Sequence, residues 1–314
     1  MIYDVTIIGA GPAGLTAAIY CGRNRLRTLV LSSNLGGQTA ISGEVANYPG
    51  YNSISGIELI NKMHQQATGT SSADIKIGTD YEITRLDYKD KEFSITTKGG
   101  ETYKSSTVII TAGKNPKRLN IPGEKEFEGR GVSYCATCDG PFFKNKTVAV
   151  IGGGYSATEA VEMLIRNNAT VFVLSISEGL DGEKITLENV KNSDKVTIVP
   201  FAHTTQILND KSKVTGVEYR DGKTGETKQI KVDGIFIEIG SQPNTTHFEG
   251  LVNLNQWKEI EVDNKNSTKI PGLFAAGDVT NVWGKQIVIA AGEGAKAAMA
   301  VGEYLARQKG GPSA

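Results

Sequence analysis

The chain contains 314 residues, of which 39% are hydrophobic and 22% charged, and Lys+Arg and Asp+Glu each total 34. This length exceeds one ordinary core and fits two domains. Zero net charge without a basic block argues against nucleic-acid binding. No apolar run approaches the roughly 18 residues of a transmembrane helix. The N-terminal stretch has no basic segment before its first motif, so we expect no signal peptide and a cytoplasmic protein.

A strand-turn-helix-strand unit opens the chain and recurs later. Residues 2–8 predict a short buried strand, "GAGPAG" a turn, residues 15–26 a helix and residues 27–33 a second strand. The second copy has strands at residues 146–151 and 169–175, joined by "GGGYSA" and another helix. Two copies of this unit predict two nucleotide-binding domains with parallel sheets.

The first turn has the spacing Gly9-x-Gly11-x-x-Gly14 between a strand and a helix. Gly9 permits a tight turn, Gly11 lets the backbone approach a pyrophosphate, and Gly14 allows close packing of helix and strand. The free N–H groups at the helix start would bind the anion. The acid that usually meets the ribose is missing, because the second strand ends in Ser32 and Ser33.

The second turn, Gly152-x-Gly154-x-x-Ala157, predicts a second dinucleotide site. The strand that follows it ends in "SISE", and no basic residue appears before Lys184. A 2′-phosphate needs Arg or Lys at this position, whereas a free 2′-hydroxyl is usually met by an acid. The sequence therefore favours NADH over NADPH, with Glu178 or a serine at the ribose.

Two exits from the predicted sheets resemble each other. Residues 107–119 and 234–248 each show an apolar strand, a Gly and a Pro three residues later. We predict an α/β fold with two Rossmann-like domains, the second inserted in the first. The first domain would consist of residues 1–115 and 244–314 and the second of residues 116–243, with the two exits as a possible hinge.

The stretch "SYCATCDGPFF" contains Cys135 and Cys138, followed by Asp139. A metal site would need further ligands, but the three histidines of the chain are scattered, so we predict no metal. A structural disulfide around so small a loop would restrict little chain entropy. The pattern favours a redox-active dithiol/disulfide, with Asp139 as proton carrier. The third cysteine, Cys21, is expected to be a buried core thiol.

This cysteine motif between two nucleotide turns resembles the low-molecular-weight thioredoxin reductases, which belong to the pyridine nucleotide-disulfide oxidoreductases. The stretches "GGQ", "NYPG", "TAG" and "PGLFAAGDV" share the resemblance, which covers essentially the whole chain. The C-terminal part, with "QPNTTHFEG" and "GKQIVIAAGEGAKAA", is similar to the flavoprotein part of alkyl hydroperoxide reductase. That flavoprotein has an extra N-terminal thioredoxin-like domain, which we do not expect here.

The resemblance implies FAD at the first turn and NADH or NADPH at the second. Asp278 would bond the ribityl chain of FAD, and Lys285 stands where the family has Arg. The positions that match FAD contacts are Gly9, Gly11, Pro12, Ala13, Gly14, Gly37, Gln38, Asn47, Ala112, Gly113, Gly277, Asp278, Lys285, Gln286 and Ile287. Those that match nicotinamide nucleotide contacts are Gly152, Gly154, Ser156 and Ala157.

The resemblance also implies a cytoplasmic homodimer that reduces the disulfide of thioredoxin or a thioredoxin-like protein. Cys138 would lie nearest the flavin, and Cys135 would attack the partner disulfide. The basic "HRR" cluster of the NADPH-using relatives is absent, which again favours NADH. Two alternatives remain: a reductase for a peroxiredoxin or glutaredoxin-like partner, and a reductase with a non-nicotinamide donor. A diaphorase or sensor is disfavoured, because such relatives usually lack the cysteine pair.

Overall fold

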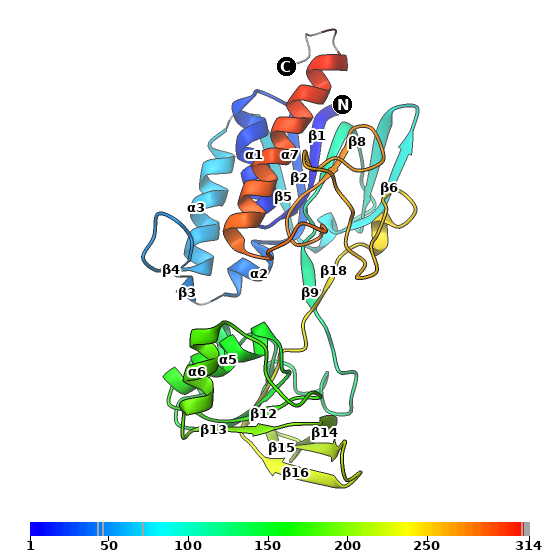
Figure 1. Cartoon of the computed structure of the whole chain (residues 1–314). Helices are drawn as coiled ribbons and strands as arrows, with labels where there is room; N and C mark the ends of the chain where they lie inside the picture. The colour runs from blue at the N-terminus through cyan, green and yellow to red at the C-terminus, as the bar shows by residue number, and fades with distance from the viewer. Residues whose placement is uncertain (43, 46, 71, 309, 311–314) are drawn as a thin grey trace. The chain divides into compact units, whose positions relative to one another are not determined.

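The computed structural model describes residues 1–42, 44–45, 47–70, 72–308 and 310, without the side chains of residues 44, 137 and 138. The chain forms two compact units (Figure 1). Unit 1 consists of Met1–Asn115 and Gln242–Ala314, and unit 2 of Pro116–Ser241. Each contains a sheet with parallel strands, so the predicted α/β class with two Rossmann-like sheets is confirmed.

Unit 1 is built on a seven-stranded sheet in the order β5-β2-β1-β8-β7-β6, with β19 also paired to β8. The pairs among β1, β2, β5, β8 and β19 are parallel, whereas β6, β7 and β8 form an antiparallel meander. The strands are Ile2–Ala10 (β1), Thr28–Leu35 (β2), Ala73–Ile77 (β5), Ile83–Lys89 (β6), Glu92–Thr97 (β7), Thr102–Ile110 (β8) and Leu273–Ala275 (β19).

Three long helices cover one face of this sheet. They are Pro12–Arg23 (α1), Gly56–Thr68 (α3) and Ile287–Gln308 (α7). The helix α1 starts earlier than residue 15, because Pro12 has the fixed φ that suits a first helical position. Small residues let α1 and α7 approach closely, and a Cβ on Gly294 of α7 would lie 2.0 Å from the carbonyl oxygen of Ala13. The shorter elements of unit 1 are Gly37–Ala40 (α2), Glu44–Val45 (β3), Ile54–Ser55 (β4), Thr79–Tyr81 (η1) and Thr246–Phe248 (η3).

Unit 2 has a five-stranded parallel sheet in the order β10-β17-β11-β12-β13. Its central strands are continuous apolar runs, as expected where both faces of a parallel sheet are covered. One face packs against α5 and α6, and the other against the antiparallel meander β14-β15-β16. The elements are Val132–Ser133 (β10), Ala136–Asp139 (α4), Gly140–Phe143 (η2), Thr147–Ile151 (β11), Tyr155–Arg166 (α5), Thr170–Leu174 (β12), Lys184–Asn192 (α6), Val196–Val199 (β13), Ala202–Asn209 (β14), Val214–Asp221 (β15), Thr227–Lys231 (β16) and Gly234–Ile237 (β17).

Two short strands connect the units and pair with each other: Lys114–Pro116 (β9) and Ser241–Pro243 (β18). Each follows a glycine in a left-handed conformation, with φ of +64° at Gly113 and +88° at Gly240. Both turns therefore use a left-handed conformation that glycine adopts more easily than any other residue.

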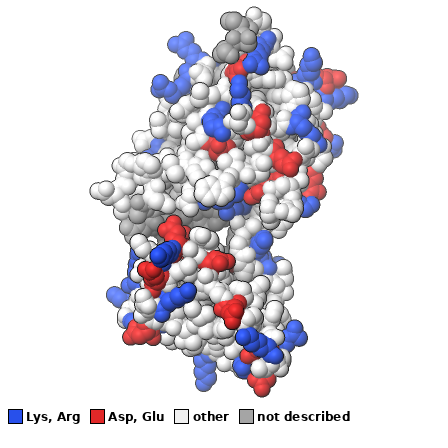
Figure 2. Space-filling view, viewed as in Figure 1, with Lys and Arg blue, Asp and Glu red and all other residues white. Residues whose placement is uncertain are grey.

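The surface in Figure 2 shows acidic and basic side chains interspersed, without a large patch of one sign on the face in view. Within the described part of the chain, no helix is both long and apolar enough to cross a bilayer.

Candidate nucleotide and disulfide sites

The turn between β1 and α1 has two closely packed glycines and one open glycine. A Cβ on Gly9, whose φ is +113°, would lie 2.3 Å from the carbonyl oxygen of Thr111, and a Cβ on Gly14 would lie 1.9 Å from the carbonyl oxygen of Gly9. Gly11 is open, since its nearest neighbour would be the carbonyl oxygen of Gly36 at 3.9 Å. Gly11 also caps α1 without a side-chain hydrogen bond, so the helix start keeps N–H groups for a ligand anion.

The loop after β2 lies against this turn. The Gly36 N–H donates to the carbonyl oxygen of Ala10 at 2.8 Å, and the Gly37 N–H donates to Oδ1 of Asn34 at 3.1 Å. A Cβ added to Gly37 would meet no atom within 4 Å, and Gln38 is exposed. The loop thus leaves open space next to the first turn.

The stretch "AGDV" after β19 meets the start of α1. A Cβ on Gly277 would lie 3.0 Å from the Cβ of Ala13. The neighbouring Asp278 is partly buried, and its Oδ2 lies 3.6 Å from Nζ of Lys114. The Lys114 ammonium lowers the free-energy cost of burying this carboxylate. Asp278 therefore has a partner even without a bound ligand.

Residues distant in sequence meet near the start of α7. Nδ2 of Asn47 donates to Oε1 of Gln286 at 3.1 Å. Lys285 instead contacts two other residues. Its Nζ lies 3.0 Å from Oε1 of Glu259 and donates a hydrogen bond to the carbonyl oxygen of Thr280. Of the two polar residues predicted at the flavin end, Gln286 is thus bonded to Asn47 and Lys285 is engaged elsewhere.

Where the chain leaves β8, two backbone carbonyl groups accept hydrogen bonds from Asn244. The Ala112 carbonyl oxygen accepts a hydrogen bond from Nδ2 of Asn244 at 2.8 Å, and the Gly113 carbonyl oxygen accepts one from the Asn244 N–H at 3.0 Å. Together with Gly11 and Gly37, Gly113 is a glycine at which an added Cβ would meet almost nothing. This arrangement fits a dinucleotide that approaches the backbone closely.

The turn between β11 and α5 repeats this plan in unit 2. A Cβ on Gly152, whose φ is +142°, would lie 2.1 Å from the carbonyl oxygen of Glu238, whereas a Cβ on Gly154 would meet no atom within 4 Å. Gly154 caps α5 without a side-chain hydrogen bond, and Ala157 is fully buried. The exposed Ser156 lies in the first turn of α5. The open backbone and helix start fit a second dinucleotide.

The loop after β12 folds back over this second turn. The Asp181 N–H donates to the carbonyl oxygen of Gly153 at 2.7 Å. The hydroxyls of Ser175 and Ser177 lie 2.9 Å apart, and Glu178 is exposed. Residues 175–183 therefore present hydroxyls and carboxylates, and no cation, at the end of β12.

Cys135 is disulfide-bonded, and the side chain of Cys138 lies outside the described side chains. The Cys135 N–H donates to Oγ of Ser133 at 3.0 Å, and the Asp139 N–H donates to the carbonyl oxygen of Cys135 at 3.1 Å. Cys21 is a free thiol with no exposed surface, as predicted, and burial raises its pKa to about 12. Thiol chemistry is therefore concentrated at residues 135–138.

A polar network holds the residue before the disulfide. Oη of Tyr134 donates to Oε1 of the buried Glu124 at 2.6 Å, and Nη1 of Arg118 donates to Oη of Tyr134 at 3.1 Å. Burial, followed by the bond to Glu124, raises the pKa of Tyr134 above its ordinary value. The network fixes Tyr134, and thereby the backbone that leads into Cys135.

One titratable residue that the sequence did not suggest, Glu238, lies with its backbone against the second turn. The Glu238 N–H, directly after β17, donates to the carbonyl oxygen of Ile151 at 2.8 Å, and burial raises the pKa of the Glu238 carboxyl group to about 8. The available signal was an acid at the end of an otherwise apolar strand, "GIFIE". Such a position calls for buried partners, because an unpaired buried carboxylate is costly.

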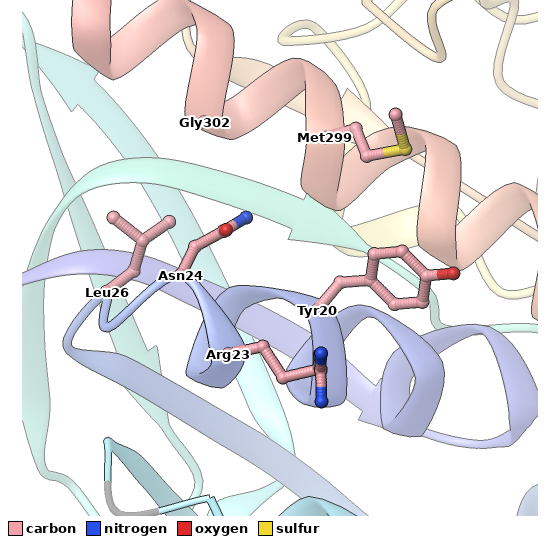
Figure 3. A pocket seen from close by; sticks show the side chains of 6 residues that line it. All are labelled: Tyr20, Arg23, Asn24, Leu26, Met299 and Gly302. Carbon is pink, nitrogen blue, oxygen red and sulfur yellow. The ribbon is translucent and has the colours of Figure 1, made fainter.

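A surface pocket occurs at the other end of α1 (Figure 3). It is lined by Tyr20, Arg23, Asn24, Leu26, Met299 and Gly302. These residues lie at the C-terminal end of α1 and on α7, away from the glycine turn, so the pocket is separate from the candidate flavin site. Among the described residues, no three His, Cys, Asp or Glu side chains gather in a way that could hold a metal ion.

Two glycine turns with open helix starts and a disulfide together point to a disulfide oxidoreductase. The chain belongs to the pyridine nucleotide-disulphide oxidoreductase family, whose model matches residues 3–294. It is 41% identical over 309 residues to thioredoxin reductase of Bacillus subtilis strain 168, and the alignment covers 97% of this chain and 95% of that protein.

Two further relatives sharpen this assignment. The chain is 38% identical over 307 residues to the F subunit of alkyl hydroperoxide reductase from Staphylococcus aureus strain MRSA252, covering 97% of this chain but 59% of that protein. A crystal structure of Lactococcus lactis thioredoxin reductase matches with a TM-score of 0.88 and 36% identity, covering 97% and 99% of the two chains. The predicted resemblance is confirmed, and the chain is a thioredoxin reductase-like oxidoreductase.

Proposed function

We propose that the chain is an FAD-dependent disulfide reductase that passes electrons from a reduced nicotinamide nucleotide to the disulfide of a thioredoxin-like protein. One observation carries the proposal: the disulfide-bonded Cys135 lies on the unit that contains the second glycine turn, while unit 1 contains the first. A disulfide in this setting has a redox role rather than a structural one.

Residues of unit 1 would hold FAD. Gly9, Gly11 and Gly14 shape the turn, and the α1 start would bind the pyrophosphate. Asp278 would bond the ribityl hydroxyls, and the Asn47–Gln286 pair would offer amide groups. Bound FAD would supply the two-electron chemistry that links a nicotinamide to a disulfide.

Residues of unit 2 would carry out the thiol exchange. In the reduced protein, the Cys135 thiolate attacks one sulfur of the partner disulfide and releases the other as a thiolate. Cys138 then attacks Cys135 in the mixed disulfide, which releases the second partner thiolate and restores the Cys135–Cys138 disulfide. Asp139 would receive the proton of Cys138 and pass it to a leaving thiolate.

The nucleotide is proposed to be NADH rather than NADPH. The loop after β12 has Ser175, Ser177 and Glu178 where a 2′-phosphate would need a cation. Anaerobic titration of the flavin absorbance with each nucleotide tests this. Bleaching by stoichiometric NADH and only by a large excess of NADPH supports the proposal, and the reverse order overturns it.

Turnover with thioredoxin tests the reductase activity. We expect NADH-dependent reduction of thioredoxin by the wild type, and reduction at background level in Cys138→Ser, which should still accept electrons at the flavin. Undiminished thioredoxin reduction by Cys138→Ser would show that electrons leave by another route.

A second candidate partner is a peroxiredoxin or glutaredoxin-like protein. It is favoured by the 38% identity to the F subunit of alkyl hydroperoxide reductase, of which this chain spans 59%. The same assay with each partner at equal concentration distinguishes them by kcat/KM. A third possibility, a non-nicotinamide donor, is supported if neither NADH nor NADPH bleaches the flavin while a reduced ferredoxin does.

A further inference from the structure

Two segments of unit 1 that are distant in the sequence leave its sheet at the same edge. β8 and β19 are parallel neighbours, and their last residues, Ile110 and Ala275, pair with each other. The Ala276 N–H then donates to the carbonyl oxygen of Ile110 at 2.9 Å, which extends the pairing by one residue. Lys114 and Asp278 therefore follow the carboxyl ends of these strands, where the first glycine turn also lies.

Lys114 and Asp278 form a partly enclosed ion pair at this edge. Nζ of Lys114 lies 3.6 Å from Oδ2 of Asp278, and the two side chains expose 26% and 25% of their surface. Among the lysines that form ion pairs in the described part of the chain, Lys285 is enclosed to the same degree, and all others expose at least 42% of their side chains. The environment of Lys114 thus differs from that of lysines in ordinary surface pairs.

This ion pair leaves Asp278 able to bind a ligand. A separation of 3.6 Å is too long for a hydrogen bond, so the Lys114 ammonium does not use up an acceptor position of the carboxylate. An ionised carboxylate offers about four acceptor positions on its two oxygens. Asp278 can therefore accept hydrogen bonds from the ribityl hydroxyls of FAD while Lys114 balances its charge.

Asp278 also lies next to the helix start that would bind the pyrophosphate of FAD. A Cβ on Gly277, directly before Asp278, would lie 3.0 Å from the Cβ of Ala13 in the first turn of α1. An unbalanced carboxylate at this place would repel the negatively charged pyrophosphate. Because the Lys114 ammonium balances the carboxylate, Asp278 and the start of α1 can bind parts of one ligand.

We propose that Lys114 is a positioning residue that strengthens FAD binding through Asp278. Its ammonium keeps the carboxylate in place for the ribityl hydroxyls, and it offsets the repulsion between this carboxylate and the pyrophosphate. The inference rests on the proposed function, because it takes unit 1 as the unit that binds FAD.

A double-mutant cycle tests whether Lys114 acts through Asp278. Equilibrium dialysis of the full-length chain gives the dissociation constant of FAD for the wild type, Lys114→Met, Asp278→Asn and the double variant. Methionine keeps an unbranched side chain but has no charge. Lys114→Met should weaken FAD binding about fivefold in the wild-type background, and by less than about twofold in the Asp278→Asn background.

An equal loss of affinity in both backgrounds overturns the proposal, because Lys114 would then contact FAD directly or only support the fold. The absence of a loss in either background also overturns it. Lys114→Gln, which is polar and uncharged, should give the same result as Lys114→Met, so the test does not depend on one replacement.

Two further variants separate the charge of Lys114 from its effect on folding. Lys114→Arg, which keeps a cation, should bind FAD within about twofold of the wild type, and a purely structural role of the lysine would not predict this rescue. Lys269→Met removes the same charge from an exposed position of unit 1 and should leave the affinity unchanged. Failure of the rescue, or an equal loss of affinity in Lys269→Met and Lys114→Met, overturns the proposal.

The outcomes distinguish this inference from the proposed function. If the wild type binds no FAD, both are wrong. If the wild type binds FAD and the effects of the two substitutions add, only the role of Lys114 is wrong. None of the measurements needs NADH or thioredoxin, so a failure of the reductase activity shows separately, as absent thioredoxin turnover.

Discussion

The two glycine turns are built on one plan but end differently. In both, the first glycine has a positive φ and lies against the backbone carbonyl of the residue that follows a neighbouring strand. This residue is Thr111 after β8 in unit 1 and Glu238 after β17 in unit 2. Gly11 and Gly154 are extended and open in both. The Thr111 hydroxyl donates to the Gly9 carbonyl oxygen at 2.9 Å and so completes the first turn without a titratable group. At the second turn the corresponding residue is Glu238, and burial raises the pKa of its carboxyl group to about 8.

The largest effect is expected at the closely packed glycines. Gly9→Ala and Gly152→Ala each place a Cβ within 2.3 Å of a carbonyl oxygen at a positive φ, and should destabilise their own unit by about 3–5 kcal/mol. Hydrogen exchange of β1 and β11 measures each unit separately. If either substitution lowered the hydrogen-exchange protection of β1 and β11 equally, the stabilities of the two turns would not be independent.

The open glycines should separate binding from folding. Ala fits the extended backbone of Gly11 and Gly154, so the free energy of unfolding should change by less than about 1 kcal/mol. The added Cβ would occupy the space for the phosphates, and affinity should fall by at least about tenfold, for FAD in Gly11→Ala and for ADP-ribose in Gly154→Ala. Equilibrium dialysis measures both. Unchanged affinity would place the ligands elsewhere.

The acid of the second turn should make unit 2 depend on pH. The pKa of Glu238 rises from its ordinary value of 4.5 to about 8 in the folded protein, so unfolding releases a proton between these pH values and stability falls as pH rises. Glu238→Gln removes this loss. Relative to pH 5, the variant should gain about 4 kcal/mol over the wild type at pH 9, measured by hydrogen exchange of β11. A pH-independent difference would contradict the raised pKa.

The smallest effect concerns the choice of nucleotide. Ile176, 71% exposed directly after Ser175, could carry a cation toward a 2′-phosphate. Ile176→Arg should raise the affinity for NADPH about tenfold and leave that for NADH unchanged. Ile185→Arg, at a 72% exposed position on α6, is the control with the same change in charge. An equal gain in both variants would indicate only general attraction of the extra phosphate.

Local patterns predicted the turns well, because a glycine between an apolar strand and a helix is restricted by its immediate neighbours. The same holds for Cys21, whose flanking Ala and Ile residues indicated burial. Glu238 was not predicted, since its environment depends on Ile151 and Gly152, which only the folded sheet brings to it. Lys285 at the flavin stays a prediction from its motif, and in the structure its ammonium lies beside Glu259.

The order of the segments has a consequence for synthesis on the ribosome. Unit 1 needs both ends of the chain, because β19 pairs with β8 and α7 packs on α1. Unit 2 is one continuous stretch, Pro116–Ser241. Domains generally fold as their residues emerge from the ribosome. Unit 2 can therefore reach its native state before β19 and α7, the last strand and helix of unit 1, have been synthesised. Cys135 and Cys138 would then belong to a finished unit before the flavin site exists.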